Sequence, residues 1–408
     1  MNVLELSVRN LLRNPRRTAV TALSLAVGFA AIALFAGYTA TVYESLKSQA
    51  IYGELLGHLT IARPAYFEAS RQEPTRFLLG KEQVGSISSI VKSEFPGSTV
   101  AVRLGFSGLL SNGRASSIFV AESLDPEAMR ALRGPRARAS GGLDEKSPQG
   151  VTLSRGLAQI LNLRDGSDGA VLVSTVTGQA NASDVQIVDT FSTGNVATND
   201  KFMFAPLSLA QSLMDVQGQA DRVTVLLPEG TDVNTARHQL ADRLATKEDG
   251  LTVEVWQDLS IFYAQVKALF DRVFAFVLAI VLVIVAMSVA NAMGMSVIER
   301  TREIGTLRAM GLRRSGVIRI FIAEALVLVS VGCLLGAVLT VGITYGVNQL
   351  DISYRPPNAT EEVPLVIGFD LIKAGFGALA LTCIGALASL FPARRAAAQP
   401  IVISLTHV

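Results

Sequence analysis

The chain has 408 residues, of which 50% are hydrophobic and only 17% are charged, and its formal net charge is +2. This length allows two or three domains. The near-neutral charge gives no sign of a nucleic-acid-binding protein, and the charged fraction is low for a soluble protein. The two cysteines, Cys333 and Cys383, and the three scattered histidines, His58, His238 and His407, have no ligand spacing, so we predict no metal site.

Four stretches of the chain contain no Asp, Glu, Lys or Arg: residues 18–43, 273–298, 325–350 and 374–393. The first three contain 26 residues each and the fourth contains 20, and a bilayer core of about 30 Å needs about 20 helical residues. We therefore predict four transmembrane helices, TM1 to TM4, over these ranges. Buried helices of a large soluble protein are the alternative. The first stretch is longer than the core of a signal peptide, so we expect an uncleaved anchor.

Arginines indicate which ends of these helices face the cytoplasm. The leader before residue 18 holds four arginines, the segment between TM2 and TM3 holds six, and Arg394 and Arg395 follow TM4. The positive-inside rule then places both termini in the cytoplasm. The predicted order starts with a cytoplasmic interfacial helix at 1–17, TM1, an extracytoplasmic α+β domain with its stalk at 44–271, and TM2. A charged cytoplasmic segment at 299–319, TM3, a short external loop at 351–373, TM4 and a cytoplasmic tail at 394–408 follow.

The long region between TM1 and TM2 alternates strand-like and helix-like patterns. The pattern predicts strands at 57–62, 98–104, 105–111, 116–122, 169–178, 185–192, 221–229 and 251–256, and helices at 81–95, 125–134, 152–163, 206–214 and 232–246. A polar loop is predicted at 134–149. Residues 257–272 lead helically into TM2 without Gly or Pro. We predict an α+β domain of two intertwined subdomains.

Several chemical motifs are absent from the sequence. No G-x-x-x-x-G-K-[ST] loop, G-x-S-x-G elbow or H-E-x-x-H motif occurs, so we expect no ATP site and no hydrolase centre. The four apolar stretches also lack the ionisable residues that ion-coupled transporters use. We therefore expect a protein that is not an enzyme and that receives its energy from elsewhere.

The charged segment after TM2 reads "ERTREIGTLRAMG" over residues 299–311. Its spacing puts Ile304, Leu307 and Gly311 on one helical face and predicts a short helix over 302–310 that ends at the glycine. Glu299–Arg302 and Arg300–Glu303 have the spacing of i,i+3 ion pairs. The segment is either a loop that only sets topology or a docking helix with a narrow apolar face, and the residues alone leave both open.

Residues 296–336, "SVIERTREIGTLRAMGLRRSGVIRIFIAEALVLVSVGCLLG", closely resemble the segment between helices 2 and 3 of ABC permeases of the MacB/FtsX superfamily. The shared pattern is E-R-x-R-E-I-G-x-L-R-A-x-G, followed by an amphipathic run and a Glu before an apolar helix. The tail "LFPARRAAAQPIVISL" is similar to the end of the same family. "GHLTIARPAYF", "SRGLAQILNL" and "QDLSIFYAQVKALFDRVFAF" look most like the lipoprotein-release (Lol-type) branch.

The resemblance implies a four-helix permease in the bacterial inner membrane, paired with an identical or paralogous second permease and two copies of a separate ABC ATPase. ATP and Mg would be bound by that ATPase and no cofactor by this chain. ATPase-coupling residues would be Glu299, Arg300, Arg302, Glu303, Ile304, Gly305, Leu307, Arg308 and Gly311, with Ile304 and Leu307 as apolar knobs. Polar residues at the membrane interface would be Arg313, Arg314, Arg319, Glu324, Arg394 and Arg395, with an arginine of this layer paired to Glu324. Gly28, Ala33 and Gly37 would permit close packing of two permeases.

The same resemblance implies mechanotransmission, in which ATPase motion is relayed through helices 1 and 2 to a periplasmic domain. Three functions are compatible with it. The first is extraction of a lipoprotein or lipid from the outer leaflet and its transfer to a periplasmic carrier or adaptor. The second is MacB-like export of a periplasmic small molecule, peptide or toxin. The third is FtsX-like activation of a cell-wall hydrolase, against which the size of the external region argues. We expect the first.

Overall fold

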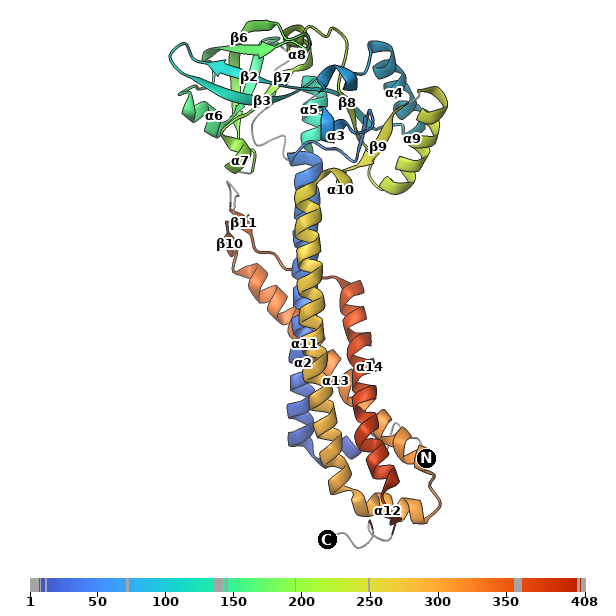
Figure 1. Cartoon of the computed structure of the whole chain (residues 1–408). Coiled ribbons are helices and arrows are strands. Elements are labelled where there is room, and N and C mark those ends of the chain that lie inside the picture. Colours follow the sequence, from blue (N-terminus) through green and yellow to red (C-terminus); the bar gives the residue numbers. More distant parts are fainter. Residues whose placement is uncertain are drawn as a thin grey trace. The chain divides into compact units, whose positions relative to one another are not determined.

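The computed structural model describes residues 7–404 apart from 8, 12, 71–72, 135–141, 144–145, 195, 249, 356–361 and 402–403. The chain forms two compact units (Figure 1). The membrane unit comprises Met1–Glu44, Val266–Ser353 and Pro364–Val408, and the inter-span domain comprises Ser45–Gln265 and Tyr354–Val363. Most of the predicted 134–149 loop and part of the 1–17 helix lie outside the described residues.

Four helices of the described chain are long and apolar enough to cross a membrane. They are α2 (Pro15–Ser48, continued by the π-helix η1, Gln49–Gly53), α11 (Ile261–Glu299), α13 (Arg314–Gln349) and α14 (Leu371–Ala398). Three of them contain a predicted stretch in full and α13 contains all of 325–350 but its last residue, so the predicted fold class is confirmed. Pro15 opens α2 at a position where its missing N–H costs no helical hydrogen bond.

Close packing of small and β-branched residues holds the membrane unit together. Val281, Val285 and Val289 of α11 belong to one buried cluster with Val329 of α13 and Leu381 of α14. Gly332 and Gly336 of α13 lie directly against α2, where an added Cβ would meet Leu25 and the carbonyl oxygen of Ala26. Figure 1 shows α2 and α11 side by side, and Phe35 stacks on Phe274 between them. Small residues allow such close approach between helices.

The predicted packing of Gly28, Ala33 and Gly37 against a second permease is wrong, because these residues face the chain's own interior. Gly28 lies against Val281, and Ala33 is 7% exposed within the membrane-unit core. A Cβ at Gly37 would lie 2.0 Å from the carbonyl oxygen of Gly368. The exposed apolar residues of α2 are on another face and include Val20, Leu23 and Val27.

The described residues between α2 and α11 form a nine-stranded sheet and several helices. The strands are β1 (Leu59–Ala62), β2 (Thr99–Ser111), β3 (Ser116–Leu124), β4 (Gly150–Ser154), β5 (Asp168–Ser174), β6 (Ala180–Phe191), β7 (Phe202–Pro206), β8 (Arg222–Leu226) and β9 (Thr252–Val255). The helices are α3 (Tyr66–Ala69), η2 (Pro74–Phe77), α4 (Lys81–Glu94), α5 (Pro126–Arg133), α6 (Arg155–Ile160), α7 (Val196–Asn199), α8 (Leu207–Met214), α9 (Val233–Lys247) and α10 (Trp256–Leu259).

These strands form two lobes that share β2. In the closed lobe the order is β3-β7-β4-β6-β5-β2, and β2 also pairs with β3, which closes a six-stranded ring. In the open lobe the order is β2-β8-β1-β9. Residues 99–103 of β2 pair with β8, whereas residues 104–111 pair with β3. The closed lobe is inserted in the chain between β1 and β8, so the prediction of two intertwined subdomains is confirmed.

Each lobe has its own apolar core. Inward-facing residues of the ring, such as Phe119, Val151 and Ile187, are fully buried with residues of α6 and α8. In the open lobe, α4 and α9 cover the sheet through residues such as Ile87 and Leu240. Alternation of buried and exposed residues along β5 and β6 is the expected pattern for strands with one face on a core.

Three local predictions differ from the structure. Residues 98–104 and 105–111 form one continuous strand, because the turn comes later, at Gly113 with φ of +83°. The predicted helix at 152–163 begins as strand β4 and becomes helical only at Arg155. Strand β7 was not predicted, since "FMFAP" is a short run without alternation, and its place depends on pairing with β3 and β4.

Candidate coupling site around helix α12

The short helix α12 (Thr301–Ala309) connects α11 to α13. It begins and ends within one residue of the predicted range. Arg300 leaves the helical conformation at φ of −114° and separates α12 from α11. Gly311 has φ of +101°, and its N–H donates to the carbonyl oxygen of Arg308 at 3.1 Å. A left-handed residue after a helix end is the conformation that glycine adopts without strain, so the predicted helix stop at Gly311 is confirmed.

The apolar face of α12 is turned into the membrane unit. Ile304 is 7% exposed and belongs to the buried cluster formed with α11, α13 and α14. Our prediction of Ile304 as an outward-facing knob is therefore wrong, because this side chain covers the chain's own core. Leu307 is half-buried, and Met310, just beyond α12, is 73% exposed. The exposed large apolar side chain of this segment is thus Met310.

Charged residues of four segments meet around α12, and we call this set the α12 charge layer. It comprises Arg13, Arg17, Glu299, Arg300, Glu303 and Glu324. Arg13 forms an ion pair with Glu303. Arg17 lies 2.9 Å from Glu299, and Arg300 lies 3.1 Å from Glu303. The predicted Arg300–Glu303 pair is confirmed. Glu299 contacts Arg17 and Asn14 in place of the predicted Arg302, which is exposed.

Glu324 of α13 is the most buried member of the layer, at 1% exposure. Arg300 donates to its Oε1 atom at 2.5 Å, and Asn10 donates to the same atom. Glu324 therefore has the arginine partner that was predicted for it, but the partner is Arg300 at the start of α12 and not one of the arginines predicted at the membrane interface. Sequence reasoning missed the contribution of the leader. Arg13 and Glu303 are 290 residues apart in the chain, and no local pattern joins them.

Electrostatics favour the charged form of Glu303 in this layer. Partial burial raises the pKa of Glu303, but hydrogen bonds from Arg13 and Arg300 outweigh this effect and hold its pKa below the ordinary value. Arg308 donates to the carbonyl oxygen of Gln399 and so joins α12 to the end of α14. The arginines predicted at the membrane interface, Arg313, Arg314, Arg319, Arg394 and Arg395, are all exposed.

This arrangement contains the elements of a docking surface. The buried Arg300–Glu324 pair fixes the start of α12 to α13, and the exposed Arg13–Glu303 pair joins α12 to the leader. Arg302, Thr306, Ala309 and Met310 are exposed on its outer side. Among the residues that the structure describes, no group of three His, Cys, Asp or Glu side chains could hold a metal ion.

Comparison with protein families agrees with these two units. Residues 18–243 match the MacB-like periplasmic core domain, and residues 275–401 match the FtsX-like permease C-terminal domain. The chain belongs to the MacB/FtsX family of ABC permeases. It is a multi-pass membrane protein with a periplasmic-type domain between its first and second spans, and its family works with an ABC ATPase.

Individual relatives of this permease match it only in part. It is 31% identical over 205 residues to the macrolide export ATP-binding/permease protein MacB of Chromobacterium violaceum, covering 49% of this chain and 30% of that protein. It is 24% identical over 203 residues to an uncharacterized ABC transporter permease of Methanocaldococcus jannaschii, covering 49% of each chain. The matched region thus spans less than half of either relative.

Two solved structures similar to this permease are extracytoplasmic domains. The periplasmic region of MacB from Actinobacillus actinomycetemcomitans aligns with a TM-score of 0.38 at 14% identity, covering 52% of this chain and 92% of that chain. The extracellular domain of the noncanonic ABC-type transporter YknZ from Gram-positive bacteria aligns with a TM-score of 0.33 at 12% identity, covering 48% and 98%. The family assignment rests on the two domain matches.

Proposed function

We propose that this permease receives the work of ATP hydrolysis at α12 and relays it to the inter-span domain. The observation that carries the proposal is the construction of α12. Its inner side is held by Ile304 and by the buried Arg300–Glu324 pair, and its outer side presents Arg302 and Met310. A rigid element with an exposed mixed polar and apolar face is suited to transmit motion from a docked partner.

The partner in this proposal is a separate ABC ATPase in two copies, which binds ATP and Mg. The permease itself pairs with an identical or paralogous second permease. The arginine distribution supports a location in the bacterial inner membrane with both termini and α12 in the cytoplasm and the inter-span domain in the periplasm.

The cargo that we propose is a lipoprotein or lipid extracted from the outer leaflet, passed to a periplasmic carrier or adaptor. The spanning helices support this choice, because their central stretches carry no ionisable side chain that would line a polar path. Their outer faces expose large apolar residues, including Phe276 of α11 and Leu379 of α14. Such surfaces are compatible with acyl chains.

A second candidate is export of a small molecule, peptide or toxin from the periplasm. The similarity to the macrolide export protein of Chromobacterium violaceum favours it. Proteoliposomes containing the permease and its ATPase separate the two candidates. ATP-dependent release of a triacylated lipoprotein to a soluble carrier supports the first, and ATP-dependent transport of a macrolide without lipoprotein release supports the second.

The docking role of α12 is tested with charge substitutions on its exposed side. Met310→Asp and Arg302→Glu are expected to weaken copurification of the ATPase and to reduce its stimulation by the permease at least about tenfold, because hot-spot contacts carry most of the binding energy. Ser315→Asp is the matched control, since it adds the same charge at an exposed position of α13. If both α12 variants still form the complex with the ATPase as the natural protein does, α12 is not the docking element.

A further inference from the structure

Both ends of the Ser45–Gln265 part of the inter-span domain lead into its open lobe. η1 leads into β1, and β9 leads through α10 into α11. β1 and β9 are paired neighbours, with Leu59 opposite Val255. If the spanning helices relay motion, as proposed above, that motion enters the open lobe first. The closed lobe receives it through the junction between the lobes and through η1, which also lies against α5 and Gly194.

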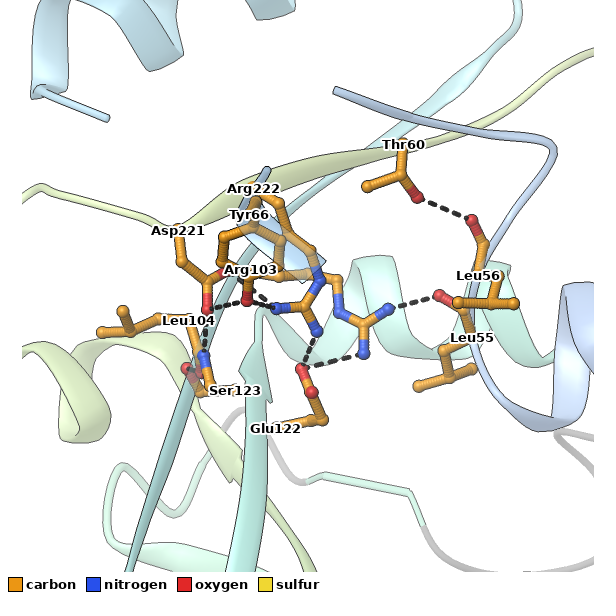
Figure 2. Close-up of polar contacts among 11 residues, drawn as sticks. Leu55, Leu56, Thr60, Tyr66, Arg103, Leu104, Glu122, Ser123, Asp221 and Arg222 are labelled. Atoms are coloured by element: carbon orange, nitrogen blue, oxygen red, sulfur yellow. Dashed lines mark hydrogen bonds and ion pairs between the residues drawn. The ribbon is translucent and has the colours of Figure 1, made fainter. Parts of the chain in front are cut away.

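The chain crosses this junction twice. It leaves the open lobe inside β2, between Arg103, which pairs with β8, and Leu104, which pairs with β3. It returns after α8 at Asp221 and Arg222, where β8 begins. Side chains at both crossings belong to one polar group, shown in Figure 2. We call it the interlobe ion cluster, and it comprises Tyr66, Arg103, Glu122, Asp221 and Arg222.

Glu122 of β3 is the closed-lobe member of the interlobe ion cluster. Its Oε2 atom accepts from Arg103 at 2.9 Å and also from Arg222, so both arginines of the open lobe converge on one oxygen. Burial by itself raises the pKa of Glu122, but Arg103 and Arg222 outweigh burial and hold its pKa below the ordinary value. The carboxylate is therefore charged at neutral pH and accepts both bonds.

Asp221 holds the second crossing in place. Its Oδ2 atom accepts from the backbone N–H of Gly105 at 2.6 Å, just past the crossing in β2, and from the hydroxyl of Tyr66 at 2.7 Å. Its Oδ1 atom accepts from Arg222 at 2.9 Å. Arg103 also donates to the carbonyl oxygen of Leu55, in the segment that joins η1 to β1. The interlobe ion cluster thus links the entry segment, the open lobe and the closed lobe.

The burial of these charges argues for a geometric role. Arg103 is 2% exposed, and Asp221 and Arg222 are each 6% exposed. Removing charges from water costs about as much as their pairing gains, so a buried ion pair is a weak source of stability. Charge-assisted hydrogen bonds are nevertheless directional. The neighbouring residues Leu55, Ala101 and Leu124 are buried in one apolar cluster, and the hydrophobic effect that favours their burial is not directional.

We propose that the interlobe ion cluster is a rigid joint that holds the open and closed lobes at one angle, so that motion entering through β1 and β9 moves both lobes together. Without it, β2 would act as a hinge at Arg103–Gly105, and the closed lobe would lag behind the open lobe.

The test measures the spread of the interlobe distance in the full chain in detergent. Spin labels are attached at Ser89→Cys on α4 and at Gln179→Cys in the turn between β5 and β6, two exposed positions on different lobes. Cys333 and Cys383 are replaced by Ala so that only these sites react. Arg103→Met keeps an apolar stem of similar length but removes the charge. We expect its distance distribution to be about twice as broad as that of the unsubstituted cluster.

Two further variants complete the test. Tyr66→Phe removes one hydroxyl and is expected to broaden the distribution less, and it decides the outcome if Arg103→Met does not fold. Glu94→Gln removes an exposed ion pair with Arg243, within the open lobe, and is expected to leave the width unchanged. Folding is checked by fluorescence of the single tryptophan, Trp256. An unchanged width in folded Arg103→Met, or in Tyr66→Phe where Arg103→Met does not fold, overturns the proposal. The measurement contains no ATPase and no nucleotide. Its result therefore does not depend on whether an ATPase docks at α12.

Discussion

Arg300 donates a hydrogen bond from Nη1 to Oε1 of Glu324 at 2.5 Å, although the two residues are 24 positions apart in the chain. Arg300 precedes α12, and Glu324 lies in α13 with its side chain 2% exposed. The same guanidinium contacts Glu303 within α12. This one side chain therefore fixes the orientation of the proposed coupling helix relative to the spanning helix that follows it.

Removal of Arg300 is expected to destabilise the membrane unit. Arg300→Ala leaves the buried carboxylate of Glu324 without its cation, which costs on the order of 3 kcal/mol in the free energy of unfolding. Glu324→Gln is expected to cost less, because a neutral amide is cheaper to bury. Chemical denaturation in detergent measures both, and exposed Arg302→Ala is the control. Equal losses in Arg300→Ala and Arg302→Ala would contradict the importance of the buried pair.

Gly37 is expected to tolerate no side chain. Gly37→Ala places a Cβ 2.0 Å from the carbonyl oxygen of Gly368 and disturbs the hydrogen bond from Gly368 N–H to Gly37 at 3.3 Å. The backbone shift this requires costs about 1–3 kcal/mol. Gly342→Ala in α13 meets no atom within 4 Å and is expected to be neutral or slightly stabilising. Thermal unfolding in detergent compares the stability of the two variants. If Gly37→Ala is as stable as Gly342→Ala, the close contact between Gly37 and Gly368 is refuted.

His58 is expected to make the stability of the inter-span domain depend on pH. Burial, together with the charge of Lys47, lowers the pKa of His58, whose Nδ1 atom accepts from the N–H of Leu227 at 2.9 Å. Between this lowered pKa and about 6.5, the unfolded chain binds a proton that the folded chain does not. The contribution of His58 is therefore complete above about pH 6.5 and declines as the pH falls through that value.

The pH effect is measured by urea unfolding followed through Trp256 fluorescence at several pH values. His58→Asn keeps an acceptor near the Nδ1 position and removes the titration, so the unfolding free energy should fall less between about pH 7 and pH 5. His238 is exposed on α9. The unfolding free energy of His238→Asn should therefore fall with decreasing pH as much as that of the natural protein. If the unfolding free energy changes with pH equally in the natural protein and in His58→Asn, His58 is not the origin of the pH dependence.

Lys373 is expected to stabilise the start of α14 through aromatic rings. Its Nζ atom lies 4.9 Å from the ring centroid of Tyr43 and 5.8 Å from that of Phe274. Lys373→Gln should lower the free energy of unfolding by about 1 kcal/mol, and Lys373→Arg should retain most of the effect because a guanidinium also binds ring faces. Arg272→Gln, an exposed change in α11, serves as the control. Equal stability of the Gln and Arg variants of Lys373 would count against the cation–π contact.

Much of this protein could be predicted from the sequence because the relevant signals are local. Each spanning helix follows from about 20 consecutive apolar residues, and the end of α12 follows from one glycine that can adopt a positive φ. The Arg300–Glu303 pair follows from i,i+3 spacing on a helix. The α+β character of the inter-span domain follows from the period of its apolar residues.

Other properties depended on distant parts of the chain. Ile304 was predicted to be an outward-facing apolar contact, but α11, α13 and α14 bury it. Gly37 was predicted to pack against a second permease, but Gly368 of the same chain lies against it. The interlobe ion cluster unites residues separated by up to 156 positions. Periodicity identifies the face on which a side chain lies, whereas the segment that covers this face is decided by tertiary packing. For that reason the sequence by itself determined the spans, the helix stop and the fold class, and only the tertiary structure decided which residues of α2 and α12 are buried and how the two lobes are joined.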